Sequence, residues 1–416
     1  MPFNNTYSYD KSLMIYYKKD NIYENFKDNI TQYCAKYNKN RPECIIYMRI
    51  YSHSTIYSDK DVIKNKHEIK YVPPNLIELD FSGDLVGPFN MGYYKMLKHI
   101  FVKIPDNLPQ SLKILKCNDG YLENIYYLPQ ILEELHAQNN YIASIDCNIP
   151  DTLYYLTISS NNLQEIPNIK NIKHFDISQN YIKLLYISNK IKYFNISNNP
   201  LSNNISNNIS NNISNNICDI ISKLDNTKRL YVSSCNLDSL INIPLKIHNL
   251  ECKHNKLLSL NIDNMPLLKN INASYNNLTY ISYNNSPMIK CLSIENNNLV
   301  NLPDFLPPKI QRFICNNNKL IYLPYIFDNR KLYELNVSNN NLIELPELPI
   351  IRNNNIIINN IIINNNNIKY LSPHNINIFK KSYINYSYYI HNIKSNPFYD
   401  EFIEILKTSD VKLTYW

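Results

Sequence analysis

The sequence has little glycine and tryptophan: its 416 residues include only 4 Gly and 1 Trp. Loops that cradle phosphate groups need Gly where the backbone approaches the ligand closely, and the four glycines match neither the Rossmann nor the P-loop spacing. The nine cysteines include no Cys-x-x-Cys pair of the kind that holds zinc. These absences argue against nucleotide and metal sites, and we expect no cofactor.

Long apolar runs and blocks of one charge are also missing. No stretch reaches the ~18 uninterrupted apolar residues typical of a membrane-spanning helix, and charged residues interrupt the first thirty positions, so we expect no membrane segment or signal peptide. The formal net charge of +7 is spread over the chain, which favours neither nucleic acid nor an acidic membrane as a partner. An odd cysteine count, with Cys117, Cys252 and Cys315 at apolar frame positions, predicts a reduced, cytoplasmic protein.

Asparagine, by contrast, is abundant, and aligning the chain on one Asn reveals a repeat. The frame reads apolar, two variable, apolar, one variable, apolar, two variable, Asn, one variable, apolar, as in Leu153, Leu156, Ile158, Asn161 and Leu163. The other Asn anchors are Asn140, Asn180, Asn199, Asn255, Asn276, Asn297, Asn318, Asn340 and Asn366, with Gly120 and Cys235 at two further anchors.

The anchors are 19 to 22 residues apart except at two low-complexity insertions. One step of 36 contains four copies of Ser-Asn-Asn-Ile at residues 202–217, and removing those 16 residues restores a step of 20. A step of 26 contains an Asn/Ile tract at residues 353–367, where Ile361, Ile363, Asn366 and Ile368 still satisfy the frame.

This frame resembles that of the leucine-rich-repeat family, Leu-x-x-Leu-x-Leu-x-x-Asn/Cys-x-Leu. The segment Leu345-Pro-Glu-Leu-Pro349 is similar to the short repeats of bacterial effector proteins, and the composition is similar to that of leucine-rich-repeat proteins of AT-rich giant DNA viruses, for which the compartment would be the host cytoplasm. The resemblance implies a repeat solenoid, a horseshoe or arc with a parallel β-sheet on its concave face.

The spacing predicts how such a solenoid is built. Alternating apolar residues send their side chains to one face of a short strand, and stacked repeats bury that face. The Asn amide can satisfy backbone groups where the chain turns after the strand. About ten residues remain for the return path, and Pro recurs there, so we expect an extended or polyproline-like convex side with little helix outside the caps.

Three regions follow from the frame. Residues 1–72 lack it and are expected to form an N-terminal capping region of unknown type. Residues 73–371 hold about 12 to 14 repeats by the frame, beginning with two degenerate copies around Leu79 and Met96. Residues 372–416 are expected to contain a last strand near Ile390 to Ile393, followed by a cap with a short helix after Pro397.

Variable positions between the inward residues form columns on the expected concave face. Tyr and Arg are the residues that most often anchor protein interfaces. The candidate protein-binding residues are Tyr155, His174, Tyr193, Arg229, Tyr231, Glu251 and Lys253, and Glu134, His136, Asn249 and Arg312 belong to the same columns. No catalytic or metal residues are predicted.

The leading functional hypothesis is a non-catalytic scaffold that binds a protein partner on the concave face. One alternative is a substrate-recognition subunit of a ubiquitin-ligase complex, acting through the first 70 or so residues. Another is a drifting member of an expanded family without a selected ligand. Nucleic-acid binding would require a basic stripe that the mixed concave columns lack, and the oligomeric state stays open.

Overall fold

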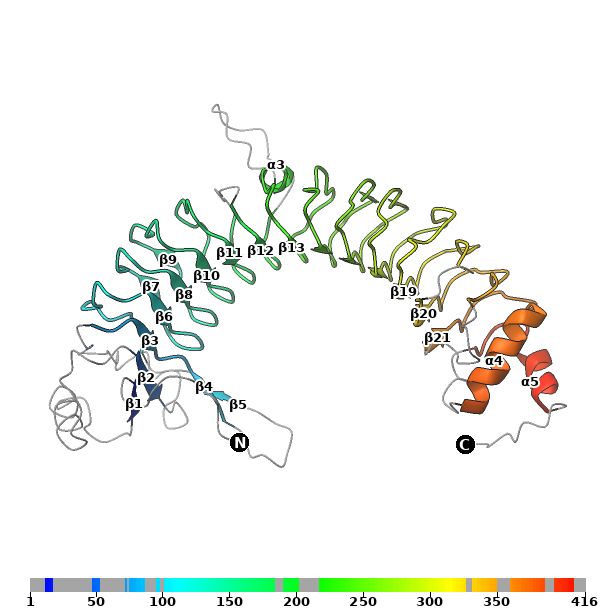
Figure 1. Cartoon of the computed structure of the whole chain (residues 1–416), viewed down its shortest axis with the longest axis horizontal. Helices are drawn as coiled ribbons and strands as arrows, with labels where there is room; N and C mark the ends of the chain where they lie inside the picture. Colours follow the sequence, from blue (N-terminus) through cyan, green and yellow to red (C-terminus); the bar gives the residue numbers. More distant parts are fainter. Residues whose placement is uncertain are drawn as a thin grey trace. The chain divides into compact units, whose positions relative to one another are not determined.

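The computed structural model describes most of the repeat array and parts of both terminal regions. The described residues are 12–17, 47–52, 72, 75–86, 95–97, 101–183, 190–201, 217–326, 331–349, 360–385 and 393–407. The chain divides into two compact units, residues 1–200 and 201–416. Figure 1 shows that each unit is a stack of short turns in which the strand of one turn lies beside the strand of the next.

The first unit contains a parallel sheet of consecutive turns. Its strands, in hydrogen-bonded order, are β1 (Ser12–Tyr17), β2 (Tyr47–Ser52), β3 (Glu78–Asp80), β6 (Ile114–Lys116), β8 (Glu134–His136), β10 (Tyr155–Thr157), β11 (His174–Asp176) and β12 (Tyr193–Asn195). The return segments of two turns form a smaller parallel pair, β7 (Asn124–Ile125) and β9 (Ser144–Ile145).

The second unit repeats this design. Its main strands are β13 (Arg229–Tyr231), β14 (Asn249–Glu251), β16 (Asn270–Asn272), β18 (Cys291–Ser293), β19 (Arg312–Ile314), β20 (Glu334–Asn336) and β21 (Asn360–Ile362). The smaller parallel pair is β15 (Ser259–Asn261) with β17 (Tyr280–Ser282). Its helices are α3 (Ile217–Ser222), α4 (Pro373–Asn385) and α5 (Tyr399–Lys407).

The apolar frame residues form the core of each unit. In the main sheet from β3 onwards, the middle residue of each strand is buried and lies in register with its counterpart one turn away, as Leu156 does with Phe175 and Phe175 with Phe194. Burying a side chain of this size contributes about 1.5–3 kcal/mol, so stability accumulates turn by turn. Cys117, Cys252 and Cys315 occupy the apolar frame position directly after their strands. They are fully buried, which confirms the prediction for them.

A buried asparagine amide bridges adjacent turns at ten of the described anchor positions, with Gly120 and Cys235 as the exceptions. In Asn180, Nδ2 donates to the carbonyl of Ile177 at 3.1 Å and to that of Ile158, one turn earlier, at 3.0 Å, while Oδ1 accepts from the N–H of Leu163 at 3.0 Å. The same pattern recurs at Asn140, Asn161, Asn199, Asn255, Asn276, Asn297, Asn318, Asn340 and Asn366. We call this series the asparagine ladder.

The residue before each ladder Asn is in the left-handed backbone region. Its φ lies between 53° and 57° at every such position from Asn139 to Asn365. Asn tolerates this region better than most residues, and it holds the position in several Asn-Asn pairs, such as Asn139-Asn140 and Asn317-Asn318. The Asn-Asn dipeptide is therefore one structural unit: its first residue reverses the chain and its second bridges the turns.

Prolines mark the turn that leads into the strand. The carbonyl of a proline accepts a hydrogen bond from the N–H three residues later, where the first buried frame residue lies. The pairs are Pro109 with Leu112, Pro129 with Leu132, Pro150 with Leu153, Pro244 with Ile247, and Pro307 with Ile310. Each of these prolines is the first residue of its turn, and because Pro has no N–H it cannot continue a hydrogen-bonded return segment.

The repeat-solenoid fold is confirmed, but one expected repeat is wrong. Strand β3 pairs directly with β6 through Leu79 and Leu115, so the copy proposed around Met96 adds no strand between them. Residues 95–97 instead form β5 (Lys95–Leu97), which is antiparallel to β4 (Asp84–Val86). The ladder position of that copy is His99, which has no amide to bridge two turns.

At the carboxyl end the structure has more helix than expected. Helix α5 follows Pro397 as predicted, and α4 was not foreseen. Ser372 Oγ accepts from the N–H of Asn375 at the start of α4, and the buried Asn375 side chain accepts from the N–H of Leu348 at 3.0 Å. The expected last strand near residue 390 and the Ser-Asn-Asn-Ile expansion before Ile217 lie outside the described residues.

We predict that the ladder dominates the stability of each turn. Replacing Asn276 by Ala leaves the buried Leu257 N–H without its acceptor and removes one of the two amide donors from the carbonyls of Cys252 and Ala273. It should lower the free energy of unfolding by about 3 kcal/mol. Urea denaturation followed by circular dichroism measures this change. The exposed neighbour is the control, and Asn277→Ala should cost less than about 0.5 kcal/mol. Equal effects of the two substitutions would contradict the role of the ladder.

Candidate functional site

The outward residues of the strands in the first unit include a column of stacked rings. Tyr155 stacks on His174 with ring centroids 4.0 Å apart, and His174 stacks on Tyr193 at the same distance. His136 packs against the other side of Tyr155 at 4.7 Å. The four residues come from β8, β10, β11 and β12 and are half-buried. We call them the ring column.

Tyr155, His174 and Tyr193 stack because the register places them directly opposite one another on neighbouring strands, whereas His136 lies opposite Thr157 and meets Tyr155 diagonally. Strand neighbours in a sheet are about 4.8 Å apart, close to the preferred separation of offset rings. Because each ring covers the face of its neighbour, the polar atoms at the ring edges remain available for hydrogen bonds. Burial raises the pKa of Tyr155, helped by Glu134 and Asp176, so its hydroxyl stays a hydrogen-bond donor at neutral pH.

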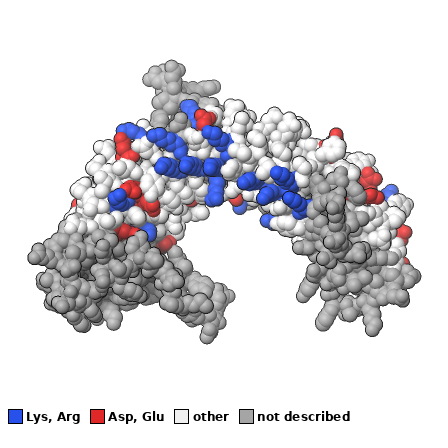
Figure 2. Space-filling view, viewed as in Figure 1, with Lys and Arg blue, Asp and Glu red and all other residues white. Residues whose placement is uncertain are grey.

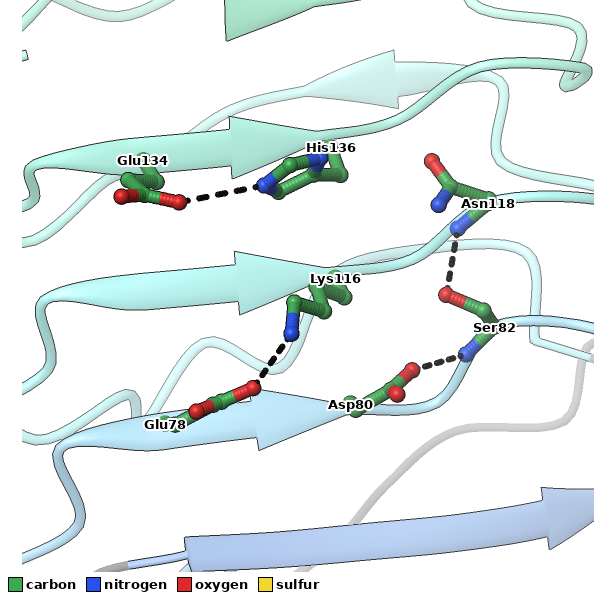
Figure 3. Close-up of polar contacts among 7 residues, drawn as sticks. All are labelled: Glu78, Asp80, Ser82, Lys116, Asn118, Glu134 and His136. Atoms are coloured by element: carbon green, nitrogen blue, oxygen red, sulfur yellow. Dashed lines mark hydrogen bonds and ion pairs between the residues drawn. The ribbon is translucent and has the colours of Figure 1, made fainter. Parts of the chain in front are cut away.

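A polar cluster continues the outward face towards β3. Figure 3 shows Lys116 reaching across to Glu78, with Nζ and Oε1 2.5 Å apart, and His136 lying 3.4 Å from a carboxylate oxygen of Glu134. The Ser82 N–H donates to Asp80 Oδ1 and the Asn118 N–H donates to Ser82 Oγ, which joins the ends of two strands. Each cation here has an acidic neighbour, so this part of the face is electrically mixed.

In the second unit the outward face has a hollow of about 370 Å³. Its polar lining includes Tyr231, Asn249, Glu251, Asn270, Asn272, Cys291, Ser293 and Arg312. The Asn270 amide donates to Asn249 Oδ1 at 2.8 Å, and the Arg312 guanidinium is paired with Glu334. The hollow therefore offers amide, hydroxyl and guanidinium groups already held by their neighbours, together with the Glu251 carboxylate.

Cysteine in this part of the chain is poorly suited to nucleophilic chemistry. Burial raises the pKa of the Cys291 thiol above its ordinary value of 9.0, so it stays protonated at neutral pH. Burial likewise raises the pKa of Cys252 to about 12. Within the described ranges no three His, Cys, Asp or Glu side chains could hold a metal ion together.

The structure brings together some of the predicted residues and not others. Tyr155, His174 and Tyr193 belong to the ring column, and Tyr231 and Glu251 line the hollow. Two predicted residues stay apart from these features: Arg229 is exposed at the start of β13, and Lys253 is half-buried after β14.

The sequence-based selection missed other residues of the hollow. They are Asn270, Asn272, Cys291, Ser293 and Ile314. They occupy the same frame positions as the chosen residues, so reading every turn by position rather than by residue type finds them.

No protein-family model matches the sequence, and no curated protein matches it. Solved structures do. A leucine-rich repeat protein of Leptospira interrogans is similar with a TM-score of 0.58 and 19% identity over 90% of each chain. YopM from Yersinia enterocolitica is similar with a TM-score of 0.56 and 22% identity over 79% of this chain, which spans 65% of YopM.

These likenesses define the class of protein by its fold. The stacked parallel strands, the repeat of about 21 residues and the bridging asparagines are those of a leucine-rich-repeat solenoid, as the sequence frame predicted. A third structure, described as a TDR receptor, has a TM-score of 0.53 and 17% identity over 82% of this chain and 58% of its own. In the part of the chain that the structure describes, no helix is long and apolar enough to span a membrane.

We predict that His136 titrates below the ordinary pKa of 6.5, because burial disfavours the imidazolium more than Glu134 favours it. The unfolded chain then takes up this proton at a higher pH than the folded chain does. His136 should therefore lower the stability as the pH falls below about 6.5, and a His136→Phe variant should lose less stability between pH 7 and 5. NMR titration of the labelled imidazole gives the pKa, and a value of 6.5 or above would contradict this.

Proposed function

We propose that this protein is a non-catalytic scaffold that binds a protein partner on the outward strand face, and that the ring column anchors the partner in the first unit. The ring column is the observation that carries the proposal. A fold shared with YopM and a Leptospira protein supports the architecture of such a scaffold but names no partner.

The ring column has the physical properties of an interface anchor. Tyr and His expose broad side chains with few rotatable bonds, so fixing them against a partner costs little conformational entropy. In this protein the stacking has already fixed them: Tyr155 and Tyr193 each lie 4.0 Å from the His174 ring. A partner meets a preorganised ridge with polar edges rather than loose side chains.

The hollow of the second unit supplies a different kind of contact. Amides of Asn249 and Asn270 and the carboxylate of Glu251 can exchange hydrogen bonds with the backbone of an extended segment. Tyr231 adds an aromatic side chain beside them. We propose this hollow as a second contact site, suited to a polar, extended stretch of a protein partner.

A reducing compartment fits this proposal. All seven cysteines among the described residues are free thiols, and five of them are buried. A cytoplasmic location therefore remains our expectation. The ubiquitin-ligase alternative depends on the first 70 or so residues, most of which lie outside the described residues, and it stays a prediction.

The proposal predicts that removing the rings releases the partner. A variant with Tyr155→Ala, His174→Ala and Tyr193→Ala should weaken binding at least tenfold, since anchor residues each contribute about 1–2 kcal/mol or more. Proximity labelling in the cell that expresses the protein identifies partners, and calorimetry with the purified partner measures the affinity.

The matched control removes tyrosines from outside the strands of the same unit. Tyr126 and Tyr181 are 59% and 56% exposed, and their double replacement by Ala should leave binding unchanged. Circular dichroism checks that both variants keep the fold. A folded ring variant that retains every partner would overturn the proposal.

A further inference from the structure

The edge of the second unit from which the strands start is uniformly basic. We define the lysine edge as residues 226–229, 246–249, 267–270, 288–291 and 309–312, which are the three residues before each of the strands β13, β14, β16, β18 and β19 together with its first residue. Its cations are Lys228, Arg229, Lys246, Lys269, Lys290, Lys309 and Arg312. These twenty residues include no Asp or Glu.

Backbone hydrogen bonds between turns align three of these cations, Lys228, Lys269 and Lys290, in one row with His248. The N–H of His248 donates to the carbonyl of Lys228, that of Lys269 to His248, and that of Lys290 to Lys269, at 2.7 to 2.8 Å. Residues joined in this way lie about 4.8 Å apart. Each turn therefore contributes one residue to the row, which consists of Lys228, His248, Lys269 and Lys290. Lys246 and Lys309 precede the row by two residues in their own turns.

Little negative charge opposes this row. Among the described ion pairs, only Arg312 of the lysine edge has a carboxylate partner, Glu334. The Lys246 ammonium donates to an amide oxygen, that of Asn226, at 3.1 Å. Asp225 directly precedes the lysine edge and Glu334 pairs with Arg312, whereas Glu251 and Glu295 come at or beyond the opposite ends of their strands.

The positive charge of this edge also affects the pKa of His248. Its pKa is lowered, first by burial and then by the positive charges of Lys269, Lys228 and Arg229. Figure 2 shows Lys and Arg side chains exposed on the described residues in this view. An excess of one charge, left uncompensated within the chain, is the usual mark of a surface that meets an oppositely charged polymer.

We propose that the lysine edge binds the phosphate backbone of a nucleic acid. The contact is to phosphates rather than bases, because the row consists of flexible ammonium groups and its twenty residues include no Phe, Tyr or Trp on which a base could stack. Binding is therefore independent of base sequence. Lys228, Lys269 and Lys290 are its centre.

A regular polyanion fits this edge better than an acidic protein does. Phosphates recur regularly along a strand, and the lysine edge presents at least one Lys or Arg in each of its five turns. Protein interfaces need a buried aromatic or apolar centre. The ring column and the hollow have such a centre. They share with the lysine edge only the strand-start residues that line the hollow. The basic stripe that the concave columns lack is present beside them.

Fluorescence anisotropy with a labelled oligonucleotide of about 20 nucleotides tests the proposal on the full chain, and we expect a dissociation constant on the order of 10⁻⁶ to 10⁻⁵ M at about 50 mM salt. Log affinity should fall linearly with log salt. The variant Lys228→Gln, Lys269→Gln, Lys290→Gln should bind at least tenfold more weakly and show a slope shallower by about 2.

A matched variant removes three charges from elsewhere in the same unit. Lys253, Lys256 and Lys319 follow the strands instead of preceding them, and their joint replacement by Gln should change binding less than about threefold if position rather than net charge decides. The ring-column variant should bind nucleic acid like the unmodified protein, so this proposal and the proposed function can fail separately.

Three results would overturn the proposal. They are absence of oligonucleotide binding at low salt, equal weakening by the two lysine variants, and competition by polyglutamate as strong as that by an oligonucleotide of equal charge, which would indicate an acidic protein instead. NMR adds a local readout, because bound phosphates should raise the pKa of His248 while the oligonucleotide is present.

Discussion

The asparagine amide that joins two turns is the interaction on which the rest of this structure depends. A single side chain donates to carbonyls in its own turn and in the preceding one and accepts from an N–H of the latter, as Asn180 does with Ile177, Ile158 and Leu163. The two bonds that cross to the preceding turn fix the register of neighbouring turns, because a shift by one residue would leave both of them unsatisfied.

Fixed register turns sequence positions into columns. When the same kind of residue recurs at one frame position, its copies lie side by side at the spacing of adjacent strands. The surface then carries a column of similar side chains. In the first unit this gives stacked rings between Tyr155 and Tyr193. In the second it gives a row of ammonium groups through Lys228, Lys269 and Lys290. Both surfaces follow from the ladder rather than from any special loop.

The two surfaces suit different chemistry. Stacked rings lose little entropy when a partner covers them, whereas ammonium groups in a row repel one another until counterions or phosphates neutralise them. The asparagines also have two roles. In the pair Asn317-Asn318, the first adopts a left-handed backbone and the second belongs to the ladder. The fold therefore uses the abundant asparagine at two positions of each such turn.

The sequence by itself determined the fold, because a repeat of apolar positions and one Asn admits a single way to bury both. It also determined the buried cysteines, the return turns at Pro, and the positions whose side chains face outwards. Tertiary structure decided which outward residues meet. Residue type alone selected Arg229 and Lys253, yet contact depends on register and on the path of each turn, which joined His136 to Tyr155 and placed Asn270 beside Asn249. The lysine edge emerged in the same way, since residues 20 or more positions apart become neighbours only when hydrogen bonds between turns align them.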